Sequence, residues 1–212
     1  DHGWRSPAAT AEEITWISPD DVASARGQRT VPETHCEISL PAAGEVAARR
    51  RWDEFRHDAL ASYDGDRDRP DRVGTSHLSI ALKWGEVHPR TLLTDLAEAA
   101  RDPATAQGAT TFRSELAWRE FYADVLHHHP ASARTSLRDV VAPDVWLTGS
   151  REAAALAAWT TGQTGYPFVD AGMRQLAETG WMHNRVRMVV ASFLVKDLHI
   201  DWRRGAACRC AC

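Results

Sequence analysis

The sequence predicts an all-α protein, and two observations carry that prediction. Apolar residues recur at helical spacing in one stretch after another, whereas the alternating β-branched runs typical of strands are almost absent. Prolines and glycines stand where these stretches begin and end. We therefore expect about six helices joined by polar loops, in a chain of 212 residues that is long enough for one domain of ordinary size.

The first 45 residues lack a sustained apolar period and carry four prolines, so we expect a linker or lead-in there. Helical spacing begins after Gly44, where Trp52, Phe55, Ala59 and Tyr63 recur along one stretch. A charged loop, DGDRDRPDRVG, then covers residues 64–74. The remaining helices are expected within residues 88–101, 110–130, 151–159, 166–180 and 181–200.

The composition excludes some classes of protein and leaves others open. With 43% hydrophobic and 25% charged residues the chain is typical of globular proteins. A net charge of −4 does not indicate a nucleic-acid binder, although a local basic face is compatible with it. The polar N-terminus is unlike a secretory signal, and the longest apolar run, residues 188–195, is too short to cross a bilayer. We expect no metal site, because the close spacing in CRCAC and the adjacent histidines of LHHHP suit neither zinc geometry nor one helix face.

The stretch GTSHLS, residues 74–79, places three hydroxyls after a glycine at the end of the charged loop. Thr75, Ser76 and Ser79, with the exposed N–H groups of such a turn, can hold phosphate oxygens. The alternative is local, since Thr75 or Ser76 can cap the helix that follows. Taken alone, the stretch favours capping.

The stretch ELAWREFY, residues 115–122, places four functional side chains on one helical face. Glu115, Trp118, Arg119 and Tyr122 stand at positions i, i+3, i+4 and i+7. In a ligand site the indole would stack on a flat partner, the carboxylate would accept from an N–H and the guanidinium would hold an anion. The alternative, which the pattern alone favours, is a surface ion pair of Glu115 with Arg119 beside a half-buried Trp118.

The stretch WMHNRVRM, residues 181–188, crowds polar groups at the head of an apolar segment. Asn184, Arg187 and Met188 fall on one face. Asn can donate and accept at the edge of a base, Arg can hold an anion, and Met offers a soft apolar contact. The alternative is an interfacial helix start with solvated arginines, and the pattern alone does not decide between the two.

Together these stretches are more specific than they are apart. The segments TSHLSIALKWGEVHPR, ELAWREFY and GQTGYPFVDAGMRQLAETGWMHNRVRMVVASFLVKDLHIDWRRG resemble the FAD-binding helical domain of the DNA photolyase and cryptochrome family. The resemblance implies a cup-like, multi-helix domain over residues 46–205, with residues 1–45 as the linker from an α/β antenna domain that this sequence lacks. Residues 206–212 diverge from the family pattern, so the resemblance also implies that the C-terminal end of the domain is missing.

The resemblance implies a folded FAD, active in its reduced form, and it assigns residues to each part of the site. Those matching the cofactor contacts are Tyr63, Thr75, Ser76, Leu78, Ser79, Arg119, Asn184 and Arg187. Those matching the catalytic pocket for a flipped-out cyclobutane pyrimidine dimer are Glu115, Trp118, Asn184 and Met188, with Arg67 and Arg185 as further DNA contacts. Trp202 matches the middle tryptophan of the family's electron relay, and Trp146 is the nearest candidate for the outer one.

The implied activity is light-driven repair of cyclobutane dimers in DNA by electron transfer from reduced FAD. The alternatives are a cryptochrome-like photoreceptor and an inactive truncated photolyase. The residues that match the dimer pocket favour repair, because a photoreceptor has no need of them. His183 does not match by position the histidines of enzymes that act on pyrimidine–pyrimidone lesions. The resemblance further implies a cytoplasmic, nucleoid-associated monomer of bacterial type, with damaged DNA as partner, no membrane and no protein partner. It leaves the antenna pigment open.

Overall fold

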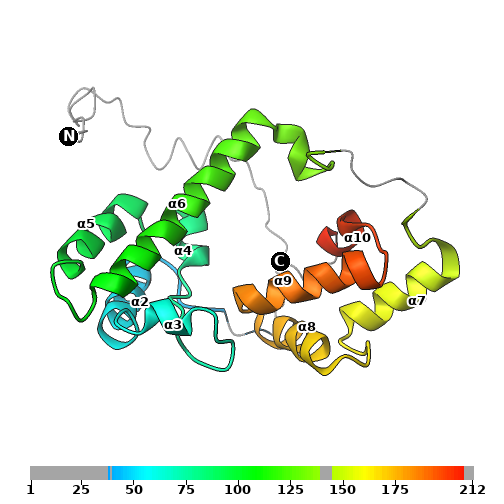
Figure 1. Ribbon diagram of the computed structural model, residues 1–212, viewed down its shortest axis with the longest axis horizontal. Helices are drawn as coiled ribbons and strands as arrows, with labels where there is room; N and C mark the ends of the chain where they lie inside the picture. The colour runs from blue at the N-terminus through cyan, green and yellow to red at the C-terminus, as the bar shows by residue number, and fades with distance from the viewer. Residues whose placement is uncertain (1–37, 39, 139–144, 208–212) are drawn as a thin grey trace, which may run out of the picture. The chain divides into compact units, whose positions relative to one another are not determined.

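The computed structural model describes residues 38, 40–138 and 145–207, which belong to one compact unit beginning at Ile38. The predicted all-α class is confirmed, since the described residues form helices and loops without a β-strand (Figure 1). Every helix in this part of the chain is too short or too polar to cross a lipid bilayer. The predicted linker lies largely outside the described residues, as do Cys36 and the three cysteines of the tail.

The helices bury two separate hydrophobic clusters. The first cluster is built by α2 (Glu45–Asp58), α3 (Tyr63–Asp66), α4 (Ser79–Trp84), α5 (Pro89–Ala99) and α6 (Ala106–His128). A short 3-10 helix, η1 (Pro130–Ala133), follows α6. The second cluster is built by α7 (Gly149–Thr160), α8 (Pro167–Thr179), α9 (Asn184–Ser192), the π-helical turn η3 (Phe193–Asp197) and α10 (Trp202–Ala206).

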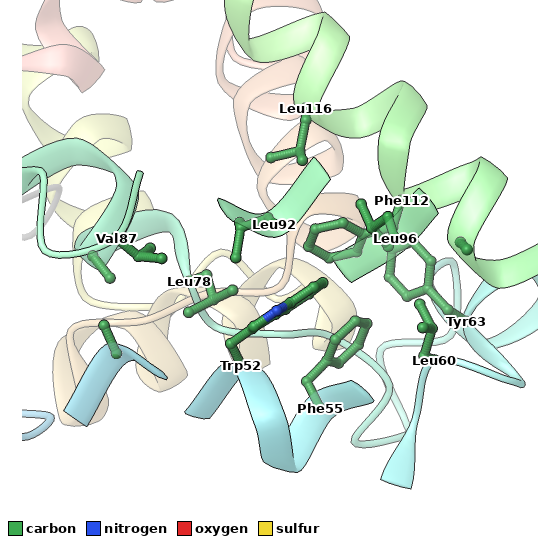
Figure 2. Close-up of a cluster of buried hydrophobic side chains, with 13 residues drawn as sticks. Trp52, Phe55, Leu60, Tyr63, Leu78, Val87, Leu92, Leu96, Phe112 and Leu116 are labelled. Atoms are coloured by element: carbon green, nitrogen blue, oxygen red, sulfur yellow. The ribbon is translucent and has the colours of Figure 1, made fainter. Parts of the chain in front are cut away.

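Trp52 forms the centre of the first cluster and is fully buried. Its indole lies among Phe55, Leu92 and Phe112, and the ring centroids of Trp52 and Phe112 are 5.2 Å apart (Figure 2). Its Nε1–H donates to Asp95 Oδ2 over 2.7 Å, so the polar end of this large side chain has a partner. The aromatic spacing found in the sequence after Gly44 therefore reflects core packing.

A glycine allows α6 to approach the turn between α2 and α3 closely. A Cβ at Gly108 would lie 1.7 Å from the carbonyl oxygen of Leu60, which is a backbone atom. The buried residues of α6 all belong to its first half, from Gly108 to Leu116. The second half of α6 presents Phe121 and Tyr122 to solvent.

A buried tryptophan with a hydrogen-bonded indole also lies at the centre of the second cluster. The Nε1–H of the buried Trp159 donates to the carbonyl of Val190 over 3.1 Å. The helix α8 packs on α9 through Gly172, where a Cβ would lie 2.4 Å from Val186 Cγ1. Close approach of these helices again depends on a residue without a side chain.

Several helix ends lie where the sequence places them. Pro89 occupies the first turn of α5, and α6 ends at His128, before Pro130. Gly180 ends α8 with a φ of 68°, in the left-handed region that suits glycine.

A helix within residues 181–200 is confirmed, but it is shorter than the prediction, because α9 and η3 together cover residues 184–197. The ring of His183 caps α9 by accepting from Arg185 N–H over 3.1 Å, so the helix begins at Asn184. At its other end α9 widens into η3, and the Asp201 carboxylate caps a separate helix, α10. The two capping side chains thus set the start of α9 at Asn184 and begin a further short helix at Trp202.

Candidate functional site

A cavity of about 520 Å³ opens beside the first cluster, among α3, α4 and α6. Six of the residues that the sequence predicts for a flavin and dimer site line it, although they come from segments as far apart as α3 and α6. These are Tyr63, Ser76, Leu78, Ser79, Glu115 and Arg119. The remaining lining residues are Leu82, Lys83, Phe112, Leu116 and Ala123. The lining therefore combines apolar side chains with hydroxyls, one carboxylate and two cations, which suits an organic anion.

Glu115 and Tyr63 both line this cavity. Arg67 Nη2 lies 2.7 Å from Glu115 Oε1, and both side chains are about one-third exposed or less. Burial, followed by the nearby Glu115 carboxylate, raises the pKa of Tyr63 to about 12. Tyr63 is therefore a neutral phenol at any physiological pH, with an O–H available to a ligand.

The expected alternative pairing of Glu115 with Arg119 does not form. Arg119 instead pairs with Glu120, and its Nη2 donates to the carbonyl of Leu82 over 3.3 Å. This leaves the guanidinium beside α4, where it borders the cavity with Lys83. Glu115 is free of Arg119 because Arg67, which is distant in sequence, takes its carboxylate.

The hydroxyl-rich stretch does not cap α4 as the local alternative expects. The N-cap position of α4 is Leu78, which offers no side-chain cap, whereas Ser76 Oγ accepts from Leu78 N–H over 3.4 Å. Ser76 and Ser79 border the cavity, and Thr75 is half-buried outside its lining. The stretch thus presents two hydroxyls to a ligand.

Trp118 lies on the exposed part of α6, with about half of its surface accessible. Its ring stands edge-on to Phe121 at 5.6 Å and lies roughly parallel to Tyr122 at 6.1 Å. It does not line the cavity, but it follows Glu115 by one turn on the same helix. An exposed aromatic plane in this position can stack on a base.

The residues predicted on α9 share one exposed face, as the sequence indicates. Asn184 Nδ2 lies 3.9 Å from Met188 Sδ, and Asn184, Arg187 and Met188 are all exposed. None of the three lines the cavity. The structure therefore groups the predicted residues of α9 with one another and the predicted residues of α3, α4 and α6 with one another.

Two contacts join the start of α9 to the segment between α3 and α4. Arg185 Nε donates to Asp68 Oδ1 over 2.7 Å, and the rings of His77 and Trp181 stack with centroids 4.2 Å apart. Sequence reasoning missed Asp68, His77 and the capping role of His183. The signal for Asp68 was present in the alternating charges of residues 64–74, but a charge run gives no partner.

His183 is almost fully buried, and its Nε2 has no hydrogen-bond partner among the residues that the structure describes. Burial lowers the pKa of this imidazole, so it is neutral at neutral pH. The neutral form is the one that can cap α9, because Nδ1 must accept from Arg185 N–H. His183 is thus a structural residue of the helix start.

Comparison with known proteins gives this geometry its context. Residues 112–210 match the family model described as the FAD-binding domain of DNA photolyase. A deoxyribodipyrimidine photo-lyase of Synechococcus sp. is 48% identical over 165 residues, which is 76% of this chain and 34% of that protein. The chain belongs to the DNA photolyase and cryptochrome family.

Two solved structures of this photolyase and cryptochrome family agree with the fold. A bacterial class III photolyase from Agrobacterium tumefaciens superposes with a TM-score of 0.71 at 42% identity, over 78% of this chain and 34% of that one. A cryptochrome of Synechocystis sp. gives 0.72 at 31% identity, over 84% and 37%. The chain thus spans about a third of the length of the photolyases it matches.

The two tryptophans assigned by resemblance to the photolyase electron relay belong to the second half of the described chain. Trp202 opens α10 and is half-buried, with its Nε1 3.5 Å from Ser136 Oγ. Trp146 is half-buried in the loop before α7. The buried Trp159, which the resemblance does not assign, is held by its hydrogen bond to Val190 at the centre of the second cluster.

Proposed function

We propose that this chain is the flavin-binding part of a deoxyribodipyrimidine photolyase, which repairs cyclobutane pyrimidine dimers in DNA with light. The single observation that carries the proposal is the cavity, because its walls bring together six residues that the family resemblance assigns to flavin and dimer binding. The family match and the relatives named photo-lyase support the same activity.

The residues present fit an FAD on the side of its phosphates. Ser76 and Ser79 supply hydroxyl donors, and Arg119 and Lys83 supply positive charge at the border of one cavity. Its volume of about 520 Å³ is in the range of cofactor sites. On α9, Asn184 and Arg187 offer an amide and a guanidinium to the cofactor from an exposed face. When bound and reduced, FAD would supply the electron that light transfers to the dimer.

The chain's own residues act on the damaged base. Glu115, as a carboxylate, has only acceptors, so it would bind the N–H of a pyrimidine ring and fix its orientation. Trp118, one turn along α6, would stack on the extruded dimer, and Asn184 and Met188 would contact it from α9. Orientation of the dimer beside the cofactor is the catalytic contribution of these groups.

The first experiment tests whether this chain holds the cofactor. We expect the purified chain, incubated with FAD and passed through a desalting column, to retain flavin absorbance in the visible region. As a matched control, Ser79→Val with Arg119→Gln removes a hydroxyl and a cation from the cavity and should release the flavin. A colourless parent protein after desalting would refute flavin binding by this chain.

The second experiment tests repair. Loaded protein, reduced and illuminated with blue light, is expected to split thymine dimers in an oligonucleotide. Glu115→Ala and Asn184→Ala are each expected to lower the repair yield more than the flavin content. Equal repair by both variants and the parent would show that the site assignment is wrong.

A blue-light photoreceptor is the second candidate, favoured by the similarity to the Synechocystis cryptochrome. The same illumination experiment distinguishes the two functions. A photoreceptor would show a light-induced change of the flavin spectrum without any loss of dimers from the oligonucleotide.

A further inference from the structure

Four charged side chains form a continuous series from the cavity to the start of α9. Glu115 borders the cavity and pairs with Arg67 at 2.7 Å, and Arg67 Nε lies 3.7 Å from Asp68 Oδ1. The same Asp68 oxygen lies 2.7 Å from both Nε and Nη2 of Arg185. Signs alternate along the series, so each cation stands between or beside carboxylates.

Asp68 is shared unequally between two arginines that come from distant parts of the chain. Its oxygen touches Arg185 at hydrogen-bond distance and Arg67 only at ion-pair distance. Arg67 in turn prefers Glu115. Half of the Asp68 side chain and 40% of the Arg185 side chain are exposed, so both can exchange partners with a phosphate at little cost.

We propose that Asp68 is a specificity-determining residue, which withholds Arg185 from DNA phosphate until a base enters the cavity. The inference rests on the proposed function, since it requires that damaged DNA places a base against Glu115. When the base takes the Glu115 carboxylate, Arg67 loses its partner and turns to Asp68. Asp68 then has two cations to satisfy, and Arg185 becomes available to a phosphate.

This exchange favours damaged over intact DNA. Phosphate contacts are independent of sequence, so an arginine that is always free strengthens binding to every duplex. An arginine released only when the cavity is filled strengthens binding to the lesion alone. The other arginines of the segment are also held, because Arg69 pairs with Asp71 at 2.7 Å and Arg72 with Asp66 at 2.6 Å.

The proposal is tested with Asp68→Asn, which keeps the size of the side chain and removes its charge. Fluorescence anisotropy would measure binding, in the dark with FAD present, to one duplex with a single thymine dimer and to the same duplex undamaged. We expect affinity for the undamaged duplex to rise about fivefold, the upper end for an exposed ion pair, with little change for the damaged duplex. The logarithmic salt dependence on undamaged DNA should steepen by about 0.9, one additional phosphate contact.

Three further variants isolate the role of Asp68. Asp58→Asn raises the net charge by the same amount, but within the described part of the chain Asp58 meets only the ring of His57. We therefore expect it to raise the affinity for both duplexes slightly and equally, and to leave the preference between them unchanged. Asp68→Glu should restore the preference for damaged DNA. In Asp68→Asn with Arg185→Gln, the gain on undamaged DNA should disappear, because the released guanidinium is gone.

Each outcome decides between distinct conclusions. Binding of Asp68→Asn to undamaged DNA at the affinity of the parent, while the parent prefers the lesion, would overturn the inference and leave the proposed function intact. A gain of equal size in Asp58→Asn would also overturn it. If the parent binds neither duplex, the DNA-binding part of the proposed function is wrong, and the role of Asp68 falls with it. Arg185→Gln alone should weaken binding to damaged DNA only, which tests the inference even if Asp68→Asn does not fold.

Discussion

The two hydrophobic clusters present their predicted site residues in different ways. Beside the first cluster, side chains from α3, α4 and α6 converge on one cavity. In the second, Asn184, Arg187 and Met188 share the exposed face of a single helix. A periodic pattern identifies a helix face equally well in both regions. Only packing between distant elements makes a concave site, and the first cluster supplies that packing.

The largest expected effect tests the packing that shapes the cavity. Gly108→Ala places a Cβ 1.7 Å from the Leu60 carbonyl oxygen, so backbone must move and α6 must separate from the turn before α3. We expect the free energy of unfolding to fall by about 3 kcal/mol, although alanine alone favours a helix. Urea unfolding followed by circular dichroism measures it. Gly65→Ala is the matched control, since a Cβ there meets no atom within 4 Å, and equal stability of the two variants would contradict the packing argument.

The equivalent substitution in the second cluster should lower the free energy of unfolding by a smaller amount. At Gly172 a Cβ would meet Val186 Cγ1 at 2.4 Å, which is a side chain and can shift with α9. We expect Gly172→Ala to lower the free energy of unfolding by about 1 kcal/mol. Hydrogen exchange should show faster exchange in α8 and α9, with α2–α6 unchanged. A loss as large as that of Gly108→Ala would show that the second cluster is as tightly packed as the first.

Much of the fold was predictable because its signals are local. Pro89, Pro167 and Gly180 mark helix ends through their own backbone preferences, and the structure places those ends as expected. The start of α9 at Asn184 and the separate helix α10 were not predicted. They depend on His183 and Asp201 acting as caps, and an apolar period does not reveal which polar residues will accept from the backbone.

A smaller effect is expected on flavin affinity, and it distinguishes the cavity from the exposed face of α9. Arg119→Gln removes a cation that borders the cavity, and we expect flavin affinity to fall about tenfold. Arg187→Gln changes an exposed residue of α9 outside the cavity and should weaken binding by about twofold at most. Titration of each variant with FAD, followed by flavin fluorescence, measures both. A greater loss in Arg187→Gln would place the main anion contact on α9.

The site could be predicted only as a set of helix faces and a family resemblance. The local alternative to a ligand site paired Glu115 with Arg119, because they are neighbours on one helix. In the structure Glu115 forms its ion pair with Arg67, which is too distant in sequence for helical spacing to predict the contact. Asp68 was missed for the same reason, since its partner Arg185 belongs to the other cluster. Pairing between distant charges is decided by tertiary structure, and a single sequence does not encode it in any local spacing.

The smallest effect concerns the turn before α8. The Asp170 carboxylate accepts from the Thr164 hydroxyl at 2.6 Å and from the backbone N–H groups of Thr164 and Gly165. These bonds, the Thr164 hydroxyl first, lower the pKa of Asp170 below 3.8. Because the folded state holds this proton less tightly, the stabilisation is present above pH 4 and is lost as pH falls through the folded pKa.

Asp170→Asn should therefore lower the melting temperature by about 2 °C at pH 7, and the difference from the parent should shrink below pH 4. Differential scanning calorimetry between pH 7 and pH 2.5 measures the difference, with Asp58→Asn as the control for a lost surface charge. A difference that stays constant down to pH 2.5 would show that the amide disturbs the turn by its shape and that ionisation of Asp170 does not stabilise it. A difference that shrinks would show that the ionised Asp170 carboxylate stabilises this turn of the second cluster. The buried Tyr63 beside the first cluster, in contrast, is a neutral phenol.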